Sequence, residues 1–278
     1  MAKAFSVASW NVEHFGAADS RTKRPKKPIE PIIEFLANQN ADVIALYEVE
    51  SSVVFRPILE AMPKHQFYIT EGPQTQEILI GIRNGLSGFV TQKLEFKSSQ
   101  PALRPGVLVT LSVDREYYPL LFLHLKSLPD PKGFGLRDYM LRLALKFRRR
   151  LDKASDGNSN YLFVGDLNTM GLDYPYSDHD ITSADEIREL KRRAAHHSKK
   201  MRVLDKTTEE TFFNGSASTL PKTALDHVVA AEHLQFKSFG GKQVDVRGWT
   251  QLADVAEQDE WISTHSDHAL LYFEVQKV

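Results

Sequence analysis

The chain has 278 residues, of which 42% are hydrophobic and none is cysteine, and its formal net charge is -1 at pH 7. Without cysteine it has neither disulfides nor thiolate metal sites, so oxygen and imidazole groups remain as metal ligands and a reducing compartment is expected. The near-zero net charge gives the molecule as a whole no polyanion-binding signature. No segment has the apolar length of a signal region or a membrane span, so we expect a soluble, cytoplasmic protein.

Short apolar runs rich in β-branched and aromatic residues predict strands. In chain order they are residues 5–10, 42–46, 78–83, 89–92, 108–113, 120–123, 161–164, 226–229 and 269–275. The spacing of apolar residues predicts helices that begin near Pro31 and that cover residues 135–152 and 184–203. Strands and helices alternate without a repeat or a linker, which predicts a single α/β domain over residues 1–278.

Asn84-Gly85 stands between two of the predicted strands. This pair is the preferred chemistry of a tight turn, so it predicts a β-hairpin that joins residues 78–83 to residues 89–92. Residues 108–113 and 120–123 are expected to form a further pair of strands.

The apolar run at residues 161–164 closes on Gly165, and Asp166 and Asn168 follow two residues apart. In extended backbone both side chains leave the same face, where a carboxylate and an amide can hold a water, a metal ion or a phosphate oxygen. The alternative is an Asx turn that caps the strand. Polar residues at the ends of other strands favour the functional interpretation.

Chemically versatile side chains stand at the ends of several other predicted strands. They are Asn11, Glu48, His124, Asp226, Asp267 and His268. Such ends gather in one crevice of a layered sheet, so we expect one site. Carboxylates such as Glu48 and Asp267 suit Mg²⁺ or Mn²⁺, which bind through one or two carboxylates and substrate phosphate. Each residue alone is more often a cap or a structural group, so the site is indicated by their joint occurrence.

Basic segments interrupt the otherwise near-neutral chain. They are residues 21–27, 137–153 and 188–202. Such runs are usually solvated faces, but several of them together favour a polyanionic substrate. We expect Arg148, Arg149 and Arg150 to belong to the cationic side of a helix that contacts a nucleic-acid backbone. Lys126 either contacts a substrate phosphate or is an ordinary solvated lysine.

The motifs, in this order, resemble those of the endonuclease/exonuclease/phosphatase superfamily. The resemblance rests on Ser9-Trp-Asn11, Asp42-Val-Ile-Ala-Leu-Tyr-Glu48, His124-Leu-Lys-Ser127, Gly165-Asp-Leu-Asn168, Leu225-Asp226-His227 and Ser266-Asp-His268. It covers nearly the whole chain and is specific for the superfamily, but it does not choose a member. It implies a four-layered α/β sandwich like that of deoxyribonuclease I, in which two packed, mostly antiparallel β-sheets are flanked by helices.

The resemblance also implies roles for single residues. Asn11, Glu48 and Asp267 match the metal-site residues, with Mg²⁺ as the expected cofactor and Mn²⁺ as its substitute. Asp166 matches the residue that orients or deprotonates the attacking water, and Asn168 matches the amide that helps to hold the phosphate.

His268 matches the histidine that contacts the scissile phosphate, and Asp226 matches the carboxylate that orients it. An Asp–His pair fixes the tautomer and stabilises an imidazolium beside developing negative charge. His124 matches the form found in deoxyribonuclease I and the phosphodiesterase branches, where abasic-site endonucleases usually carry tyrosine, and Glu77 resembles the carboxylate that partners this histidine.

Two of the departures from the family pattern lie beside the metal-binding Glu48. Tyr47 stands where the family usually has glutamine before the metal-binding Glu48. Glu50 replaces a basic or polar residue that can contact nucleic acid. Neither departure removes a catalytic group, but both weaken the transfer of DNA-contact detail from the family.

We therefore expect a magnesium-dependent phosphodiesterase that hydrolyses DNA, and among nucleases an endonuclease. One alternative is a phosphatase or phospholipase-type enzyme that acts on inositol phosphate, sphingomyelin or another small phosphoester. A catalytically inactive binding member is the alternative of another class, and the complete set of motifs argues against it. No stable protein partner is implied.

Overall fold

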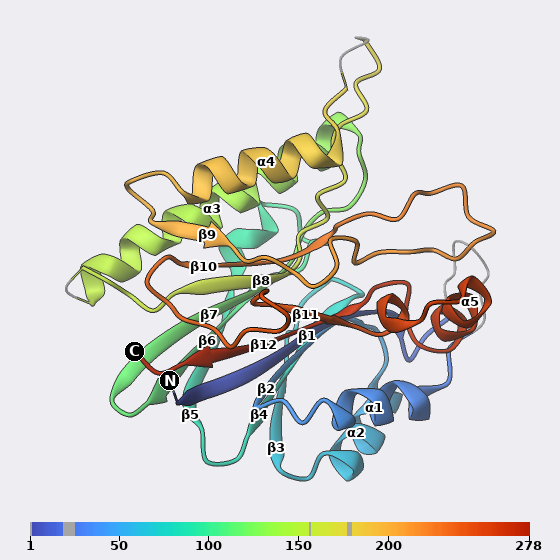
Figure 1. Cartoon of the computed structure of the whole chain (residues 1–278), viewed down its shortest axis with the longest axis horizontal. Helices are drawn as coiled ribbons and strands as arrows, with labels where there is room; N and C mark the ends of the chain where they lie inside the picture. Colours follow the sequence, from blue (N-terminus) through green and yellow to red (C-terminus); the bar gives the residue numbers. More distant parts are fainter. Residues whose placement is uncertain (1, 19–25, 156, 177–179) are drawn as a thin grey trace. The chain divides into compact units, whose positions relative to one another are not determined.

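The computed structural model of the chain describes residues 2–18, 26–155, 157–176 and 180–278. Its backbone forms two six-stranded mixed sheets with flanking helices, which confirms the predicted α/β class (Figure 1). The sheets belong to two compact units. The first unit comprises Met1–Leu86, Lys206–Lys222 and Phe236–Lys277, and the second comprises Ser87–Asp205, Thr223–Gln235 and Val278. The expectation of a single domain stays a prediction.

The sheet of the first unit has the strand order β11-β12-β1-β2-β4-β3, in which β1 and β2 are parallel and the other neighbours are antiparallel. The strands are β1 (Lys3–Phe15), β2 (Val43–Val49), β3 (His65–Ile69), β4 (Glu77–Arg83), β11 (Asp245–Arg247) and β12 (Leu270–Gln276). The helices are α1 (Ile29–Asn38), α2 (Phe55–Ala61) and α5 (Val255–Thr264), with 3₁₀ turns at Ser52–Val54 and Trp249–Gln251.

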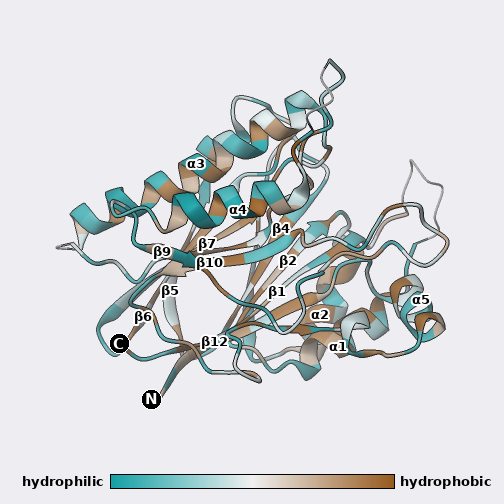
Figure 2. Ribbon diagram, turned by 45° about the horizontal axis from the view of Figure 1, so that its top comes forward, coloured by the Kyte–Doolittle hydropathy of each residue, from teal (hydrophilic) through white to brown (hydrophobic). Residues whose placement is uncertain are grey.

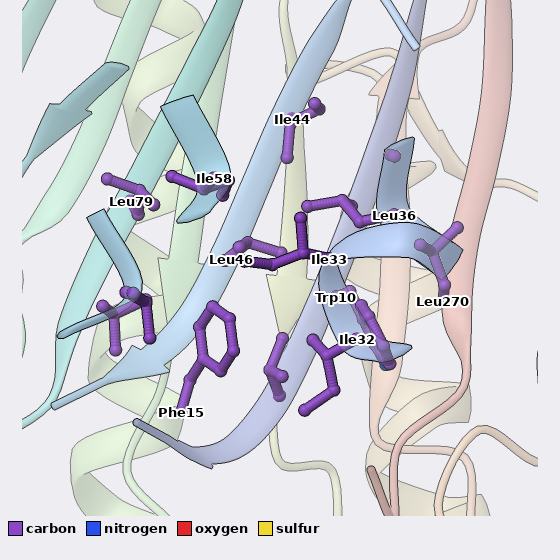
Figure 3. Packing of buried hydrophobic residues seen from close by; sticks show 14 of the residues in the cluster. Trp10, Phe15, Ile32, Ile33, Leu36, Ile44, Leu46, Ile58, Leu79 and Leu270 are labelled. Atoms are coloured by element: carbon purple, nitrogen blue, oxygen red, sulfur yellow. The ribbon is translucent and has the colours of Figure 1, made fainter. Parts of the chain in front are cut away.

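The core of the first unit lies between its sheet and α1. Ile29, Ile32, Ile33 and Leu36 recur at helical spacing and are buried, which gives α1 one apolar stripe. They pack with residues of the central strands, and Trp10 lies among them (Figure 3). The helix begins at Ile29, so Pro31 falls within its first turn, where proline costs no hydrogen bond.

Trp10 links this core to the end of the chain. Its ring centroid lies 5.2 Å from that of Phe35 and 6.0 Å from that of Trp261. Its Nε1 donates a 2.8 Å hydrogen bond to the carbonyl oxygen of His268. Trp10 thus packs in the core of the first unit, and the same side chain anchors the Ser-Asp-His motif against β1.

The sheet of the second unit has the strand order β5-β6-β7-β8-β10-β9, with β7 and β8 parallel. The strands are β5 (Ser87–Lys93), β6 (Gly106–Val113), β7 (Glu116–His124), β8 (Leu162–Asp166), β9 (Met201–Val203) and β10 (Asp226–Ala231). The helices are α3 (Pro131–Ala154) and α4 (Ser183–Ala194), with a 3₁₀ turn at Leu94–Lys97. The expected pair of strands within residues 108–123 is confirmed as β6 and β7.

Helices α3 and α4 lie side by side in the second unit (Figures 1 and 2). Both carry mixed hydrophilic and hydrophobic residues, whereas the strands are mainly hydrophobic (Figure 2). Met140 and Ala144 of α3 and Leu190 of α4 enter the core of the unit together with Phe163 of β8. Within the described ranges, no helix is long and apolar enough to cross a membrane.

Two predictions about local structure are wrong. The strands on either side of Asn84-Gly85 do not pair, because β4 belongs to the first sheet and β5 pairs with β6 in the second. The helix expected over residues 184–203 ends at Ala194, and Met201–Val203 is instead the strand β9. A turn signal shows that the chain reverses but does not show which strand the next segment joins.

Candidate active site

Asn11 and Glu48 lie on neighbouring parallel strands of the first unit. Asn11 is paired in register with Tyr47, and its Nδ2 donates a 3.1 Å hydrogen bond to Glu48 Oε1. The strand expected to end at Asn11 runs on to Phe15, and its pairing with β2 is irregular between these two residues. The irregular backbone includes left-handed conformations at Glu13 (φ 39°) and at Glu48 (φ 62°). Such strained positions concentrate at functional sites.

Further donors hold the Glu48 carboxylate in place. The backbone N–H of His14 donates to Glu48 Oε2 at 3.2 Å, and Gln76 Nε2 donates to the same oxygen at 2.9 Å. The side chain is half-buried. Glu48 is therefore fixed before any ligand arrives, as a metal-binding carboxylate should be.

Asp267 is a buried carboxylate, one of whose oxygens has no donor among the described residues. Its side chain lies in the first unit, is 8% exposed, and its Oδ1 has no hydrogen-bond partner among the described residues. Burial, together with repulsion from Glu13 and Glu48, raises its pKa to about 7, although His268 and Lys27 act in the opposite direction. A divalent cation bound here would supply the missing positive charge. Asn11, Glu48 and Asp267 offer the oxygen atoms that a hard metal ion needs, and their binding of one ion stays a prediction.

Ser266 connects the Ser-Asp-His motif to β1. Its hydroxyl donates a 2.7 Å hydrogen bond to the carbonyl oxygen of Asn11 and accepts one of 3.1 Å from the N–H of His268. The ring of His268 packs edge-on against Phe212, with centroids 5.2 Å apart. The motif is thus held by its backbone, and the imidazole is buried and supported.

His14 and Glu50 form a pair beside Glu48 that the sequence motifs did not assign to the site. His14 Nδ1 lies 2.7 Å from Glu50 Oε1. Ligand atoms of His14, Glu48 and Glu50 all lie within 4.8 Å of one another, so the three side chains could hold a metal ion. The available signal was the spacing, because Glu50 stands two residues after Glu48 and His14 three after Asn11.

His124, Asp166 and Asn168 come together in the second unit. His124 and Asp166 are in register on the parallel strands β7 and β8, and His124 Nε2 lies 3.5 Å from Asp166 Oδ2. Asp166 Oδ1 accepts a 2.9 Å hydrogen bond from the N–H of Asn168, and Asn168 Nδ2 donates to the carbonyl oxygen of Leu125 at 3.2 Å. All three predicted site residues are buried.

The backbone from Asp166 to Asn168 is an Asx turn. Strand β8 ends at Asp166, and Asn168 is left-handed with φ 52°. The expectation of extended backbone through both residues is therefore wrong, and the alternative of a turn holds. The turn still leaves Asp166 Oδ2 near His124. The carboxylate that caps the turn through Oδ1 is therefore also the one assigned to the site.

Asp226 lies beside Asp166 in the same sheet. The two residues are in register on the antiparallel strands β10 and β8, and each is 2% exposed. Two buried carboxylates on adjacent strands need positive charge or donors near them. Because His268 belongs to the first unit, the expected orientation of His268 by Asp226 stays a prediction.

Glu77 and Lys126 stand in different units. The Glu77 carboxylate accepts hydrogen bonds from the hydroxyl of Thr70 and, at 2.7 Å, from Gln74 Nε2. Its expected pairing with His124 of the second unit stays a prediction. Lys126 is half-buried and follows Leu125, whose carbonyl oxygen holds Asn168. The second unit thus provides a cation close in the chain to His124 and Asn168.

Arg148 does not belong to the exposed cationic side of α3, and this expectation is wrong. Its side chain is 2% exposed, its Nε lies 2.7 Å from Asp152 Oδ1, and its Nη2 donates to Asn158 Oδ1 at 3.0 Å. Arg149 and Arg150 are exposed, as expected. Their contact with substrate stays a prediction.

The other basic segments offer less free charge than their composition suggests. Residues 19–25 lie outside the described residues, so the segment 21–27 is described only at Lys26 and Lys27. Arg192 and Arg193 both pair with Glu189. Part of the positive charge on α4 is therefore neutralised locally.

Known proteins resemble this chain in sequence and in fold. A sequence model of the endonuclease/exonuclease/phosphatase family matches residues 8–268. Among curated proteins, no sequence matches.

Several solved structures are similar. Truncated TDP2 from Caenorhabditis elegans is 17% identical with a TM-score of 0.65, covering 98% of this chain and 97% of its own. TDP2 from D. rerio, solved with a single-strand DNA product, is 15% identical with a TM-score of 0.66, covering 98% and 99%. A mannosyl-6-phosphatase of Bacteroides thetaiotaomicron is 14% identical with a TM-score of 0.62, covering 98% and 100%. At these identities the likeness shows the fold, and the predicted deoxyribonuclease I-like fold is confirmed.

Proposed function

Because the chain belongs to the endonuclease/exonuclease/phosphatase family, we propose that it is a divalent-metal-dependent phosphodiesterase that hydrolyses DNA. The observation that carries the metal dependence is the buried Asp267 Oδ1, which lacks a donor among the described residues, in the unit that also contains Glu48 and Asn11. The DNA substrate is proposed on the cations of the second unit and on the similarity in fold to TDP2.

Asn11, Glu48 and Asp267 would hold the metal ion. When bound, a divalent ion supplies positive charge that polarises a phosphoryl oxygen. The Asn11 Oδ1 already accepts a 3.1 Å hydrogen bond from the N–H of Glu13, so its amide is oriented before a ligand arrives. Mg²⁺ is the ion that this carboxylate and amide set favours, and Mn²⁺ accepts the same ligands.

Asp166 is the proposed acceptor of the proton from the attacking water. The Asx turn holds its Oδ1, and its Oδ2 lies near the His124 ring. Asn168 is proposed to orient a phosphate oxygen with its amide. His268 would donate a hydrogen bond to the charge that develops on the phosphoryl group, and Asp226 would fix its tautomer.

Two features support a nucleic-acid substrate. Lys126 stands two residues after His124, where its charge would attract a phosphate, and Arg149 and Arg150 are exposed cations on α3. TDP2 from D. rerio, which is similar in fold, was solved with a single-strand DNA product. The three cations would bind phosphates other than the reacting one, as a polymeric substrate requires.

A small phosphoester is the second candidate substrate. Glu50 places negative charge beside Glu48, and a DNA backbone would be repelled there. The mannosyl-6-phosphatase of similar fold shows that this architecture also accommodates a sugar phosphate. A catalytically inactive binding protein is disfavoured, because every predicted catalytic and metal-site residue is present.

The deciding experiment is an activity panel with Mg²⁺ and with Mn²⁺. Its substrates are plasmid, linear duplex, single-stranded and abasic-site DNA, RNA, inositol phosphates, sphingomyelin and sugar phosphates. We expect metal-dependent cleavage of DNA without dedicated preference for the abasic site, since His124 replaces the tyrosine of abasic-site enzymes. Turnover of a small phosphoester without cleavage of DNA would overturn the proposed substrate. The absence of turnover with every phosphoester in the panel would overturn the proposal that the chain is an enzyme.

A further inference from the structure

A pocket of about 510 Å³ lies in the second unit, at the C-terminal half of α3. Arg148 and Asp152 of α3, residues 157–158, residues 197–200 and residues 232–233 line it. In Figure 1 the end of α3 and the segment between α4 and β9 approach each other in this region. The volume lies in the range of small-molecule binding sites.

The pocket lies at the opposite end of the sheet from the predicted catalytic carboxylates of the same unit. Asp226 and Asp166 are paired at one end of β10 and β8, and Ala231 donates to the carbonyl oxygen of Tyr161 at the other end. His233, two residues beyond Ala231, lines the pocket. Ala231 stands five positions after Asp226 in β10, which corresponds to about 17 Å along the strand.

Two lysines give the pocket positive charge that no carboxylate of the described residues neutralises. Within the described ranges, neither Lys199 nor Lys200 takes part in an ion pair or a side-chain hydrogen bond. The two acids that line the pocket face cations of their own: Asp152 pairs with Arg148 at 2.7 Å, and Glu232 interacts with Arg202.

Arg148 adds a buried charge that is incompletely satisfied. Its side chain is 2% exposed and lines the pocket, and its Nη1 has no hydrogen-bond partner among the described residues. A buried guanidinium nitrogen without an acceptor is costly, and an anion nearby reduces that cost. This observation is independent of the two lysines.

Electrostatic crowding supports the same conclusion. Partial burial lowers the pKa of Lys199, and the nearby charges of Arg149 and Lys146 lower it further. Positive charge is thus concentrated around the pocket rather than balanced within it. An anion is the ligand that relieves this repulsion.

We propose that this pocket is a second, non-catalytic binding site for the phosphate group of a small phosphomonoester, such as a nucleoside monophosphate. A phosphomonoester presents up to two negative charges on terminal oxygens, which a concave cationic pocket can surround. A phosphodiester within a strand presents one charge, and its chain must leave on both sides. The imidazole of His197 lies in the same lining and offers a further donor, whereas His233 Nε2 already pairs with Asn160 Oδ1 at 2.8 Å.

The test measures binding of adenosine 5′-monophosphate and of inorganic phosphate to the whole protein in EDTA, so that no turnover occurs. The local readout is the ¹H–¹⁵N NMR signal of the His197 and His233 imidazoles. We expect both signals to shift saturably. The double variant Lys199→Gln/Lys200→Gln should weaken this binding by about tenfold or more, because each charge-assisted hydrogen bond that is removed weakens it.

The matched control is Lys132→Gln/Lys191→Gln, which removes two exposed lysines from α3 and α4 outside the pocket. This variant should bind like the wild type. Arg148 is left unchanged because its loss would disturb the buried pair with Asp152.

Unmoved imidazole signals at millimolar ligand, or equal binding by the two double variants, would overturn the proposal. Tighter binding of an oligonucleotide without terminal phosphate, at the same signals, would overturn the small-molecule assignment. None of these outcomes depends on catalysis, so the proposed function stands or falls separately.

Discussion

Glu48 is the residue on which the proposed metal dependence turns. It is half-buried and held by Asn11, His14 and Gln76, and it makes no contribution to the apolar core. We predict that Glu48→Gln lowers metal affinity by about 10- to 100-fold or more while the fold stays intact. Calorimetric titration of the metal-free protein with Mn²⁺ measures the affinity, and circular dichroism checks the fold.

Glu60→Gln is the matched control, because Glu60 is an exposed glutamate of the same unit whose side chain is 63% exposed. It should bind Mn²⁺ like the wild type. Unchanged affinity in Glu48→Gln would remove this residue from the metal site.

Asp166, Asp226 and His268 are predicted to act on one phosphoryl group. Each of Asp166→Asn, Asp226→Asn and His268→Ala should lower turnover on the order of a hundredfold, because each removes one part of a single proton-transfer and charge-stabilising unit. The double variant Asp226→Asn/His268→Ala should be little worse than His268→Ala alone.

Steady-state kinetics on the substrate found in the activity panel provides the comparison. Additive losses in the double variant would show that Asp226 and His268 work independently. Wild-type turnover in Asp166→Asn would remove its role in water activation.

At the scale of elements, strands were predictable where an apolar run is continuous, as in β8, and helices where the period is clear, as in α3. The three-residue strand β9 carries no period of its own and exists through its pairing with β10, so the sequence predicts one long helix that runs on through it. Each site motif is a short continuous stretch of the chain, so the sequence alone reveals it. The left-handed turn at Asn168 and the inward side chain of Arg148 depend on tertiary contacts, which composition does not reveal.

Arg137 shows how α3 is fixed within its unit. It is fully buried, pairs with Glu186 of α4, and donates to the carbonyl oxygens of Leu128 and Gly171. We predict that Arg137→Ala destabilises the protein by about 3–5 kcal/mol, because it leaves a buried carboxylate and several acceptors unpaired. Urea unfolding measures the loss.

Arg142→Ala on the same helix is the control for this change. Arg142 is 62% exposed and pairs with Asp138, so its loss should cost about 1 kcal/mol or less. Equal costs for the two variants would contradict the structural role of Arg137.

Asp42 joins β1 to β2 and carries a pH dependence. Burial raises its pKa, but hydrogen bonds from Lys3 and Ser6 outweigh this effect and leave the pKa below its ordinary value. Because the folded state has the lower pKa, the stabilisation is present above the unfolded pKa and is lost as the pH falls through the folded value, below about pH 4. Asp42→Asn should therefore be less stable than the wild type at neutral pH, and the difference should shrink in acid.

Thermal unfolding between neutral pH and pH 3 follows this difference. A gap between wild type and Asp42→Asn that stays constant with pH would contradict the assigned pKa direction.

At the scale of the whole molecule, the exposed positive charge on α3 is predicted to bind the backbone of a DNA duplex. Arg149 lies about 27 Å along the axis of α3 from its first residue. If both exposed arginines bind phosphates of a DNA backbone, Arg149→Gln/Arg150→Gln should weaken binding to a long duplex. The slope of log affinity against log salt should then fall by about 0.9 for each phosphate that is no longer neutralised. A short oligonucleotide should be unaffected.

Fluorescence anisotropy at several salt concentrations, with the catalytically impaired Asp166→Asn as the background, provides the measurement. Lys64→Gln/Lys242→Gln is a charge-matched control, because these two exposed lysines lie in the first unit and outside the basic segments. An unchanged salt slope for the long duplex would exclude Arg149 and Arg150 from the DNA surface.

The pairing of β1 with β12 also has a consequence for biosynthesis. Lys3 is in register with Gln276, so the first sheet joins strands from nearly the whole length of the chain. During translation, β1 leaves the ribosome long before its neighbour exists, and until then one of its edges offers unpaired backbone groups to other chains. High contact order of this kind slows folding. The nascent chain must therefore keep the free edge of β1 from pairing with other chains until β12 has been made.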